Sequence, residues 1–353
     1  MVTRQTKAPG WLDALAIAHT AEAESWSGDG VVLRRLIGGA NNALYRVETG
    51  GQVYAAKLCV ADGRRRAARE YGALRLLRAA GLDIAPQPVW LDESCAILPF
   101  PLVVYRWLPG EPLDSSPASH QLAALLESYH RMHALRQTDL GSDLPDAIFH
   151  WFDFEPYLAE LRGFLAQYGA WLATTEPDGR NLRDRLACLV DRCAEALTTA
   201  DVEPGRDSFP LHLCRVDPNL ANTVWGADDQ LRWVDWEYSG WGDPALDLAE
   251  LRWHAALAEL SESQQAWLRE NYRCPEGDPG FDERLAAWDR LLATRWPFLI
   301  LRWLWSEHHG PDRVRLTHPS GDPSVLRARL TRFIERAERL ADSERSVQND
   351  RDR

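Results

Sequence analysis

Apolar and polar residues alternate with a period of two along much of the first hundred residues, which is typical of strands with one buried face. Five runs share this pattern, or a short apolar core bounded by Gly or Pro: residues 31–37, 43–49, 52–58, 86–91 and 102–107. Two segments follow a helical pattern instead, residues 11–24 and 64–80, and Gly81 marks the end of the second. The first part of the chain therefore predicts a small sheet with one long helix.

The pattern changes at residues 108–112, where the sequence Leu-Pro-Gly-Glu-Pro interrupts regular structure. The residues that follow have a helical pattern, apart from residues 211–235, which are expected to form two short strands around a turn. We therefore expect a β-rich domain at residues 1–107 and a larger, mostly helical domain at residues 108–341. The charged residues 342–353 are expected to form a disordered tail.

Three polar residues of the second domain follow one another in an order that indicates a reaction. Asp217 is followed five residues later by Asn222, and Asp235 comes directly after a mostly apolar strand. Phosphoryl transfer from a nucleotide uses this set, because one Asp orients and deprotonates the attacking hydroxyl while an Asn and a second Asp hold Mg²⁺. The turn at residues 226–229 would bring Asn222 and Asp235 together, although a surface hairpin with solvated Asp side chains has the same pattern.

Two longer stretches around these residues resemble the aminoglycoside phosphotransferase (phosphotransferase enzyme) family, which is protein-kinase-like and has choline-kinase-like relatives. Residues 215–222 (Arg-Val-Asp-Pro-Asn-Leu-Ala-Asn) resemble the catalytic loop of this family, and residues 234–249 resemble its metal-binding Asp and the start of the next helix. The resemblance implies an α+β, protein-kinase-like bilobal fold, with a small β-rich N-lobe and a larger α-helical C-lobe. It also implies ATP and Mg²⁺ as cofactors.

The resemblance assigns a role to each matching residue. Asp217 would be the catalytic Asp, Asn222 and Asp235 the magnesium ligands, and Asp247 a buried carboxylate that holds the backbone of the catalytic loop. The family usually has His-Gly before the catalytic Asp, whereas this chain has Arg215–Val216. Because the His braces the loop in the family, Arg215 is expected either to brace it differently or to mark a loop that suits another substrate.

Lys57 lies on the same face of its predicted strand as Val53 and Ala55, so its charge needs an anionic partner. Glu70 lies on the apolar face of the predicted helix and has a similar need. The resemblance implies that Lys57 grips the α- and β-phosphates of ATP and pairs with Glu70. The alternatives are a lysine at the sheet edge that reaches solvent, and a local pair between Glu70 and Arg66.

Two segments are expected to contact the nucleotide. Residues 37–45 join two predicted strands, and their small residues would let backbone N–H groups approach phosphates, although an ordinary hairpin turn explains them equally well. Residues 103–110 resemble the interlobe hinge of the family, whose backbone would hydrogen-bond the adenine. The nucleotide-binding residues expected from the two segments are Gly38, Gly39, Asn41, Asn42, Tyr105, Arg106 and Trp107.

Composition limits the classes of partner. A net charge of −12 argues against nucleic acid, since phosphate binding needs clustered Lys and Arg. Six cysteines without a Cys-x-x-Cys pair argue against a zinc or redox site and favour reduced, buried thiols in a cytoplasmic protein. His133 follows His130 by three residues without a third ligand, and we interpret it as structural. The sequence shows no signal-peptide pattern and no apolar run long enough for a membrane span.

The site of the acceptor is the least defined by the sequence. In the family, residues after the metal-binding Asp and helices of the C-lobe form it. Aromatic and acidic side chains suit an ammonium group, and the acidic net charge is compatible with a cationic acceptor such as an amino alcohol or an aminoglycoside-like sugar. The residues expected to contact the acceptor are Glu237, Trp241, Trp303 and Glu307.

We therefore predict an ATP- and Mg²⁺-dependent enzyme that transfers the γ-phosphoryl group to a hydroxyl of a small molecule. Two alternatives stay open. The Arg215–Val216 departure supports a pseudokinase-like module that binds nucleotide without turnover. A protein kinase has less support, because no Ala-Pro-Glu element follows Asp235.

Overall fold

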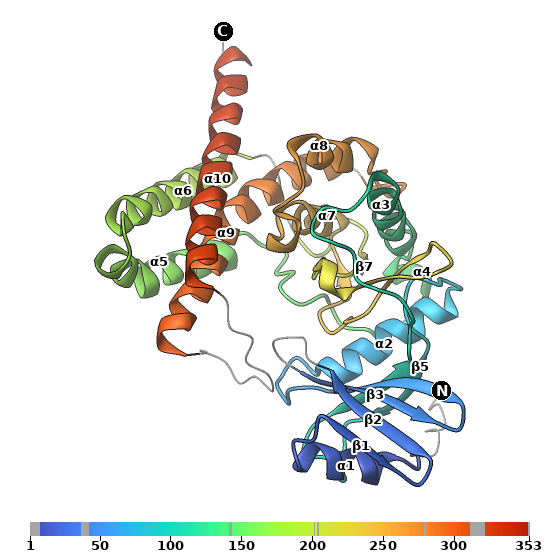
Figure 1. Cartoon of the computed structure of the whole chain (residues 1–353). Coiled ribbons are helices and arrows are strands. Elements are labelled where there is room, and N and C mark those ends of the chain that lie inside the picture. Colours follow the sequence, from blue (N-terminus) through green and yellow to red (C-terminus); the bar gives the residue numbers. More distant parts are fainter. Residues whose placement is uncertain are drawn as a thin grey trace. The chain divides into compact units, whose positions relative to one another are not determined.

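The structure is a computed structural model that describes residues 8–36, 42–140, 143–200, 202, 205–278, 280–310 and 322–351 (Figure 1). The described residues form two compact units. The first takes its residues from Met1–Ile148 and Leu213–Trp241, and the second from Phe149–His212, Gly242–Asp312 and Ser320–Arg353. The unit boundary thus differs from the domain boundary expected at residue 107. The stretch from 213 to 241, which the sequence pattern assigns to the helical domain, belongs to the first unit.

A six-stranded antiparallel sheet forms the N-terminal part of the first unit (Figure 1). Its strands are β1 (Ser25–Gly28), β2 (Val31–Leu36), β3 (Ala43–Thr49), β4 (Gln52–Leu58), β5 (Pro88–Asp92) and β6 (Leu102–Arg106). They lie in the order β1-β2-β3-β4-β6-β5. Five of the six were expected from the alternation. The edge strand β1 was missed, because its four residues contain a single apolar side chain, Trp26, and no alternation.

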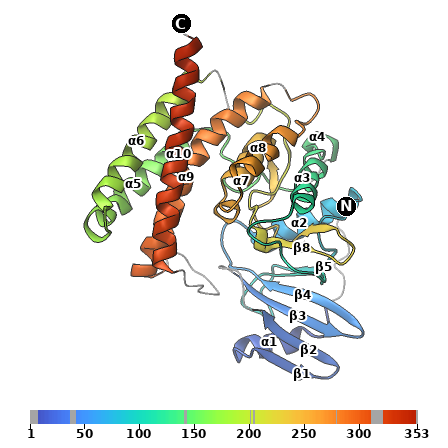
Figure 2. The ribbon, with the colours of Figure 1, turned by 45° about the horizontal axis from the view of Figure 1, so that its top comes forward.

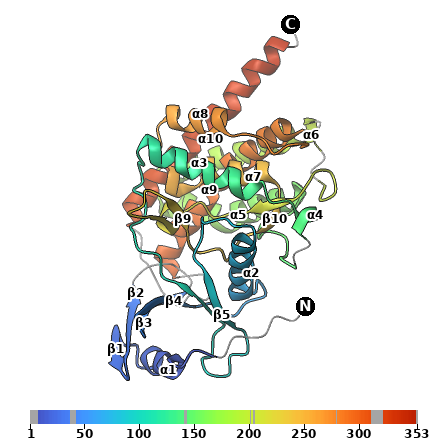
Figure 3. The same ribbon diagram turned by 90° about the vertical axis from the view of Figure 1, so that its right-hand side faces the viewer.

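The two faces of the sheet are covered by different helices (Figure 3). Helix α1 (Leu12–Thr20) buries Leu12 and Leu15 in one apolar cluster with Tyr45, Val47 and Leu58 of the sheet. Neighbouring side chains of a strand point to opposite faces, so Lys57 is directed away from α1. Helix α2 (Arg66–Ala79) packs against β5 and β6 on that other side. The alternation of side chains along β4 therefore directs Lys57, the one charged residue of this strand, toward α2.

The rest of the first unit is short elements around a hairpin. These are α3 (Ser119–His133), α4 (Gln137–Leu140), β7 (His212–Cys214), the 3₁₀ turn η1 (Leu220–Asn222), β8 (Thr223–Trp225), β9 (Leu231–Trp233) and β10 (Gly240–Gly242). The terminal residues His212 of β7 and Gly242 of β10 are assigned to the second unit. Strands β8 and β9 pair antiparallel around the turn at residues 226–229, as expected. The indole N–H of Trp233 donates to the hydroxyl of Ser128 at 2.8 Å, which ties β9 to α3.

The segment after β6 is fastened to the same hairpin. Glu111 pairs with Trp225 through two backbone hydrogen bonds. At Gly110, φ is 143°, and a Cβ there would lie 2.3 Å from the carbonyl oxygen of Trp225. Only glycine fits so close to another backbone. The linker from the sheet therefore contacts the hairpin that carries Asn222.

The second unit is helical (Figure 2). Its elements are α5 (Glu155–Thr175), α6 (Gly179–Thr199), α7 (Pro244–Trp253), the 3₁₀ turn η2 (Ala255–Leu257), α8 (Glu262–Asn271), α9 (Phe281–His309) and α10 (Pro323–Arg351). Helix α9 packs against α5, α6, α7 and α10. A β-sheet N-terminal region and a helical C-terminal region confirm the α+β class. No helix among the described residues is long and apolar enough to span a bilayer.

The structure corrects two expectations, one about the C-terminal segment and one about the burial of the cysteines. The segment from Asp342 was expected to be a disordered tail, but α10 continues through Arg351. Its buried stripe includes Leu330 and Phe333, and Glu, Arg and Ala are good helix formers, so the helix propagates beyond that stripe. All six cysteines are free, but Cys188 and Cys274 are exposed rather than buried.

Candidate active site

The ammonium of Lys57 lies among three carboxylates. Its Nζ is 2.7 Å from Oε2 of Glu70, 2.6 Å from Oδ1 of Asp235 and 3.2 Å from Oε2 of Glu237. The side chains of Lys57 and Glu70 are 6% and 0% exposed, whereas that of Asp235 is 27% exposed. The expected ion pair between Lys57 and Glu70 is therefore present, and Lys57 does not reach solvent.

A second cation completes this group. Nη1 of Arg66 donates to Oε1 of Glu237 at 2.5 Å, and its Nε donates to Oδ2 of Asp62 at 3.0 Å. The amide of Asn42 donates to Oε2 of Glu237, also at 2.5 Å. Arg66 therefore pairs with these two carboxylates and not with Glu70. We call Asn42, Lys57, Arg66, Glu70, Asp235 and Glu237 the Lys57 cluster.

The charges of the Lys57 cluster shift one another's pKa. Burial works against the charge of Lys57, but the carboxylates of Asp235, Glu237 and Glu70 outweigh it and hold the pKa of Lys57 well above its ordinary value. Burial raises the pKa of Glu70 to about 7 against the attraction of Lys57. Burial also tends to raise the pKa of Asp235, but the attraction of Lys57 is stronger and lowers this pKa below its ordinary value. Lys57 and Asp235 are therefore charged at neutral pH.

Asp217 lies at the start of the loop that leads to η1. Its Oδ1 accepts from the backbone N–H of Asn219 and its Oδ2 from the amide of Asn222, both at 3.2 Å. Burial and the neighbouring Asp235 raise the pKa of Asp217 to about 6, while Arg215 opposes the shift. A carboxylate of this pKa is a suitable general base near neutral pH.

Asn222 and Asp235 lie on the two arms of the hairpin. The backbone N–H of Val234 donates to the carbonyl of Asn222 at 2.8 Å, which fixes the two residues side by side. Because the amide nitrogen of Asn222 donates to Asp217, the amide oxygen of Asn222 is the atom that could coordinate a metal ion. An amide oxygen and a partly exposed carboxylate are the hard donors that Mg²⁺ prefers, and the pair fits a magnesium site.

Arg215 braces this hairpin. Its Nη2 donates to the carbonyl oxygens of Val234 at 2.7 Å and Asp235 at 3.3 Å. Its guanidinium carbon lies 4.3 Å from the ring centre of Trp233 and 4.9 Å from that of Trp236. Cations are attracted to indole faces at such distances. Arg215, which stands where the resemblance implies a His, thus joins the loop of Asp217 to the backbone at Asp235.

Val216, at the position of the family's Gly, has a φ of 73°. A β-branched residue rarely adopts this left-handed conformation, because its side chain crowds the backbone. Asp235 also has a positive φ, of 61°. Such strain persists only where the surroundings impose it, and it gathers at functional sites. The backbone is therefore strained at Val216, directly before Asp217, whereas an Asp such as Asp235 adopts the left-handed region more readily.

The segment expected to contact adenine lies on and after β6. Tyr105 is buried and pairs with Ala55 of β4, and burial raises its pKa well above the ordinary value. The guanidinium of Arg106 lies 4.8 Å from the ring centre of Tyr54. The backbone N–H of Trp107 donates to Val53 at 3.1 Å. Contact of this segment with a nucleotide stays a prediction. Gly38, Gly39 and Asn41 lie outside the described residues.

The residues expected to bind the acceptor have different surroundings. Glu237 is buried and both its carboxylate oxygens are bonded within the Lys57 cluster. Trp241 is 0% exposed, and its backbone pairs with Pro145 and Ala147. Neither offers a free surface to a small molecule. On α9 of the second unit, Trp303 is half-buried and Glu307 is exposed, so these two remain candidates.

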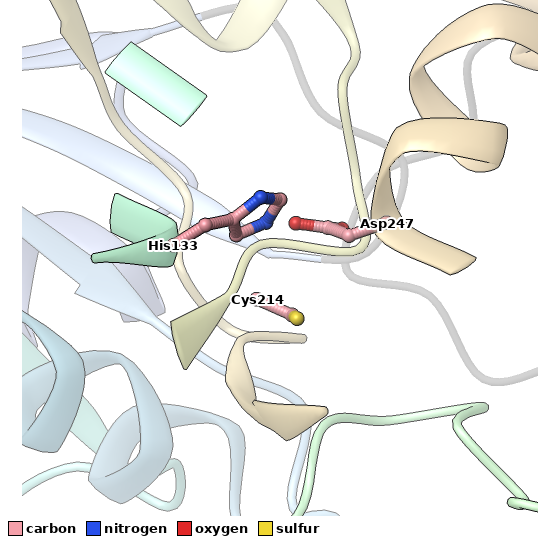
Figure 4. Close-up of side chains that lie close together, drawn as sticks. All are labelled: His133, Cys214 and Asp247. Carbon is pink, nitrogen blue, oxygen red and sulfur yellow. The ribbon is translucent and has the colours of Figure 1, made fainter. Parts of the chain in front are cut away.

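His133 is buried at the end of α3, as its structural interpretation requires. A ring nitrogen of His133 and the thiol of Cys214 lie within 4.8 Å of each other (Figure 4). Asp247, also labelled in Figure 4, belongs to the second unit and is fully buried in the first turn of α7. Its expected part in holding the catalytic loop stays a prediction.

The comparisons with known proteins identify the family and the fold. The model of the phosphotransferase enzyme family matches residues 32–287, more than half of the chain. The chain belongs to the phosphotransferase enzyme family. No curated protein matches it by sequence.

Several solved structures share the fold of this phosphotransferase family member. A putative aminoglycoside phosphotransferase from Ralstonia eutropha has a TM-score of 0.61 at 17% identity, with 94% of this chain and 98% of that chain covered. A choline/ethanolamine kinase family protein from Mesorhizobium loti has a TM-score of 0.57 at 20% identity, with 93% and 94% covered. A spectinomycin phosphotransferase in complex with ADP and spectinomycin has a TM-score of 0.61 at 14% identity, with 93% and 96% covered.

Sequence reasoning missed the place of one site residue, Arg66. It was considered only as a local partner of Glu70, four residues along the helix. One of its two carboxylate partners, Glu237, is 171 residues away in sequence. The sequence did contain a signal for this pairing, because Glu237 lies two residues after Asp235. Lys57 alone would then face the carboxylates of Glu70, Asp235 and Glu237, and a second buried cation is required to balance them.

Proposed function

We propose that this phosphotransferase transfers the γ-phosphoryl group of ATP to a hydroxyl of a small molecule, with Mg²⁺ as its metal. The observation that supports this best is the meeting of Lys57, Glu70 and Asp235 from three separate elements, beside the loop of Asp217 and Asn222. Phosphoryl transfer depends on positioned charges more than on covalent catalysis, and this set supplies them.

Each residue has a part in the proposed reaction. Asp217 orients the attacking hydroxyl and accepts its proton, and a pKa of about 6 leaves it mostly ionised at neutral pH. Lys57 binds phosphate oxygens of ATP and is held in place by Glu70. Asn222 and Asp235 would hold Mg²⁺, which when bound would supply positive charge beside the phosphates. Arg215 keeps the hairpin in shape.

We propose a cationic acceptor, such as an amino alcohol or an aminoglycoside-like sugar. The solved structures of similar fold include proteins named for spectinomycin phosphorylation and for choline or ethanolamine phosphorylation. The net charge of −12 favours the approach of a cation. Trp303 and Glu307 are the candidates that keep exposed surface, and an indole face with a carboxylate suits an ammonium group.

A screen for release of ADP over amino alcohols, aminoglycosides, macrolides and sugars would test the reaction. With the best acceptor, Asp217→Ala should lower turnover by a factor of ~10² or more while nucleotide affinity changes little. Asp114→Ala, on an exposed residue of the same unit, is the matched control and should leave turnover unchanged. Near-normal turnover of Asp217→Ala would remove the central assignment.

The second candidate function is a nucleotide-binding module without turnover. The observation in its favour is the strained Val216 beside Arg215, where the family usually has Gly after His. A module of this kind would bind ATP but release no ADP above the background rate with any acceptor, and Asp217→Ala would leave that background rate unchanged. The transfer reaction predicts hydrolysis that falls in Asp217→Ala.

A further inference from the structure

Arg64, two residues before α2, and Arg66 and Arg69 of α2 contact the short segment that follows Asp235. Arg66 pairs with Glu237 as described above. Arg64 donates to the hydroxyl of Tyr238 at 3.5 Å, and its guanidinium lies 5.8 Å from that ring centre. Nη1 of Arg69 donates to the carbonyl oxygen of Ser239 at 2.8 Å. Helix α2, which carries Glu70, is thus held by several contacts to the segment that follows Asp235.

Of these three contacts, the one made by Arg66 joins two buried charges. Its side chain is 5% exposed and that of Glu237 is 1% exposed. A buried ion pair is costly to break by removing one partner, because the other charge is left uncompensated. The Arg64 contact is partly exposed, and Arg69 donates to backbone oxygens instead. Arg66 therefore dominates the electrostatics of this contact.

The balance of charge shows what Arg66 does for Lys57. The Lys57 cluster contains the carboxylates of Glu70, Asp235 and Glu237 but only two cations. Lys57 is closer to Glu70 and Asp235 than to Glu237, the carboxylate that Arg66 neutralises. Without Arg66, Glu237 would compete for Lys57 with full charge. Lys57 would then shift toward Glu237, away from Glu70 and Asp235, and so away from its place in the proposed reaction.

We propose that Arg66 is a positioning residue of the nucleotide site, which acts by neutralising Glu237 so that Lys57 stays with Glu70 and Asp235. It also holds α2 in the orientation in which Glu70 reaches Lys57. The inference rests on the proposed function, since it concerns the affinity for ATP. It differs from a purely local role, in which Arg66 only pairs with Asp62 at the start of α2.

A double-mutant cycle separates these roles. Arg66→Met should weaken binding of ATP with Mg²⁺, measured by calorimetry, by about tenfold or more, because Glu237 then draws Lys57 away. In a Glu237→Gln background the same substitution should change affinity by less than about twofold. Asp62→Asn should leave affinity unchanged. Arg78→Met, which removes an exposed charge from the same helix, is the control for net charge.

The outcomes are distinguishable. If the unsubstituted chain binds no nucleotide, the proposed function fails whatever Arg66 does. If it binds ATP and the two substitutions are additive, or Asp62→Asn is as damaging as Arg66→Met, Arg66 has only a local structural role and the inference is overturned. If Arg66→Met does not fold, Arg66→Lys decides, since it keeps the cation: it should retain affinity within about threefold in the native background, and a larger loss would contradict the inference.

Discussion

Each unit of the molecule contains a buried group of charges, and the two groups differ in how completely they are paired. In the second unit, Arg284 lies between Asp243 and Asp278, at 3.1 Å and 2.7 Å. Trp288 donates to Oδ2 of Asp243 at 2.8 Å, and the backbone N–H of Ala245 donates to its Oδ1 at 2.9 Å. Every carboxylate oxygen of this group, which we call the Arg284 cluster, has a donor. It serves the fold.

In the Lys57 cluster, by comparison, the carboxylates are less completely buried and hydrogen-bonded. The Asp235 side chain is 27% exposed, whereas those of Asp243 and Asp278 are 1% and 0% exposed. Oε1 of Glu70 is buried and has no hydrogen-bond partner among the described residues. A native fold rarely leaves such atoms unpaired without a reason. The comparison teaches that the incomplete pairing, not the burial of charge, distinguishes the candidate site from a structural ion network.

The largest effect should come from the Arg284 cluster. Asp243→Asn keeps the shape and a capping side chain for α7 but removes a charge that Arg284 needs. We expect the free energy of unfolding to fall by about 3 kcal/mol, measured by denaturant titration. Asp184→Asn, at an exposed ion pair of the same unit, should cost less than about 0.5 kcal/mol. Equal costs would mean that burial of the pair does not matter.

The same chemical change in the Lys57 cluster should affect binding instead. Asp235→Asn leaves Lys57 with Glu70 and Glu237, so the free energy of unfolding should change by less than about 1 kcal/mol. The Mg²⁺ concentration needed for ATP binding should rise about tenfold or more, because a carboxylate ligand is lost. Calorimetry at several Mg²⁺ concentrations measures this. An unchanged metal dependence would reject the assignment of Asp235.

Backbone strain offers a third test of the comparison. Asp243 has an ordinary φ of −86°, whereas Val216 has a φ of 73°. Val216→Gly loses buried apolar surface but relieves this strain, so it should cost about 1–2 kcal/mol less than Val104→Gly, a substitution of a fully buried valine in β6. Denaturant titration of both variants measures the difference. Equal losses would show that Val216 carries no strain.

The smallest effect concerns pH. The raised pKa of Glu70, about 7, means that the folded chain holds a proton there that the unfolded chain has released. Stability therefore falls as pH rises from about 4.5 to about 7. Glu70→Gln should remove this pH dependence of stability. Between pH 5 and pH 7.5, the Tm of the variant should therefore fall by about 2–4 °C less than the Tm of the unsubstituted protein. Parallel curves for the two proteins would contradict the raised pKa.

The sequence predicts those parts of the molecule that depend on neighbours in the chain. Strands β2, β3 and β4 and helix α2 follow from alternation, helical periodicity and flanking glycines. The ion pair of Lys57 with Glu70 follows from two charges on apolar faces, which each need a partner. The spacing of Asp217, Asn222 and Asp235 indicates the proposed reaction, and the hairpin that joins Asn222 to Asp235 is short, as expected.

Contacts between distant segments could not be predicted in this way. Glu237 and Trp241 were considered as acceptor residues because they follow Asp235, but the fold buries one against Arg66 and the other against the backbone of residues 145–147. The position of Val216 in the left-handed region also leaves no sign in the sequence, since valine normally avoids it. These features depend on tertiary packing.

The Arg66–Glu237 ion pair has a consequence for regulation. In protein kinases, a phosphate added to the activation loop supplies the anion that arginines use to order this region, and activity waits for that modification. Here the anion is a glutamate that is made with the chain. The pairing of Arg66 therefore needs no added phosphate, because its anion is a residue of the chain itself.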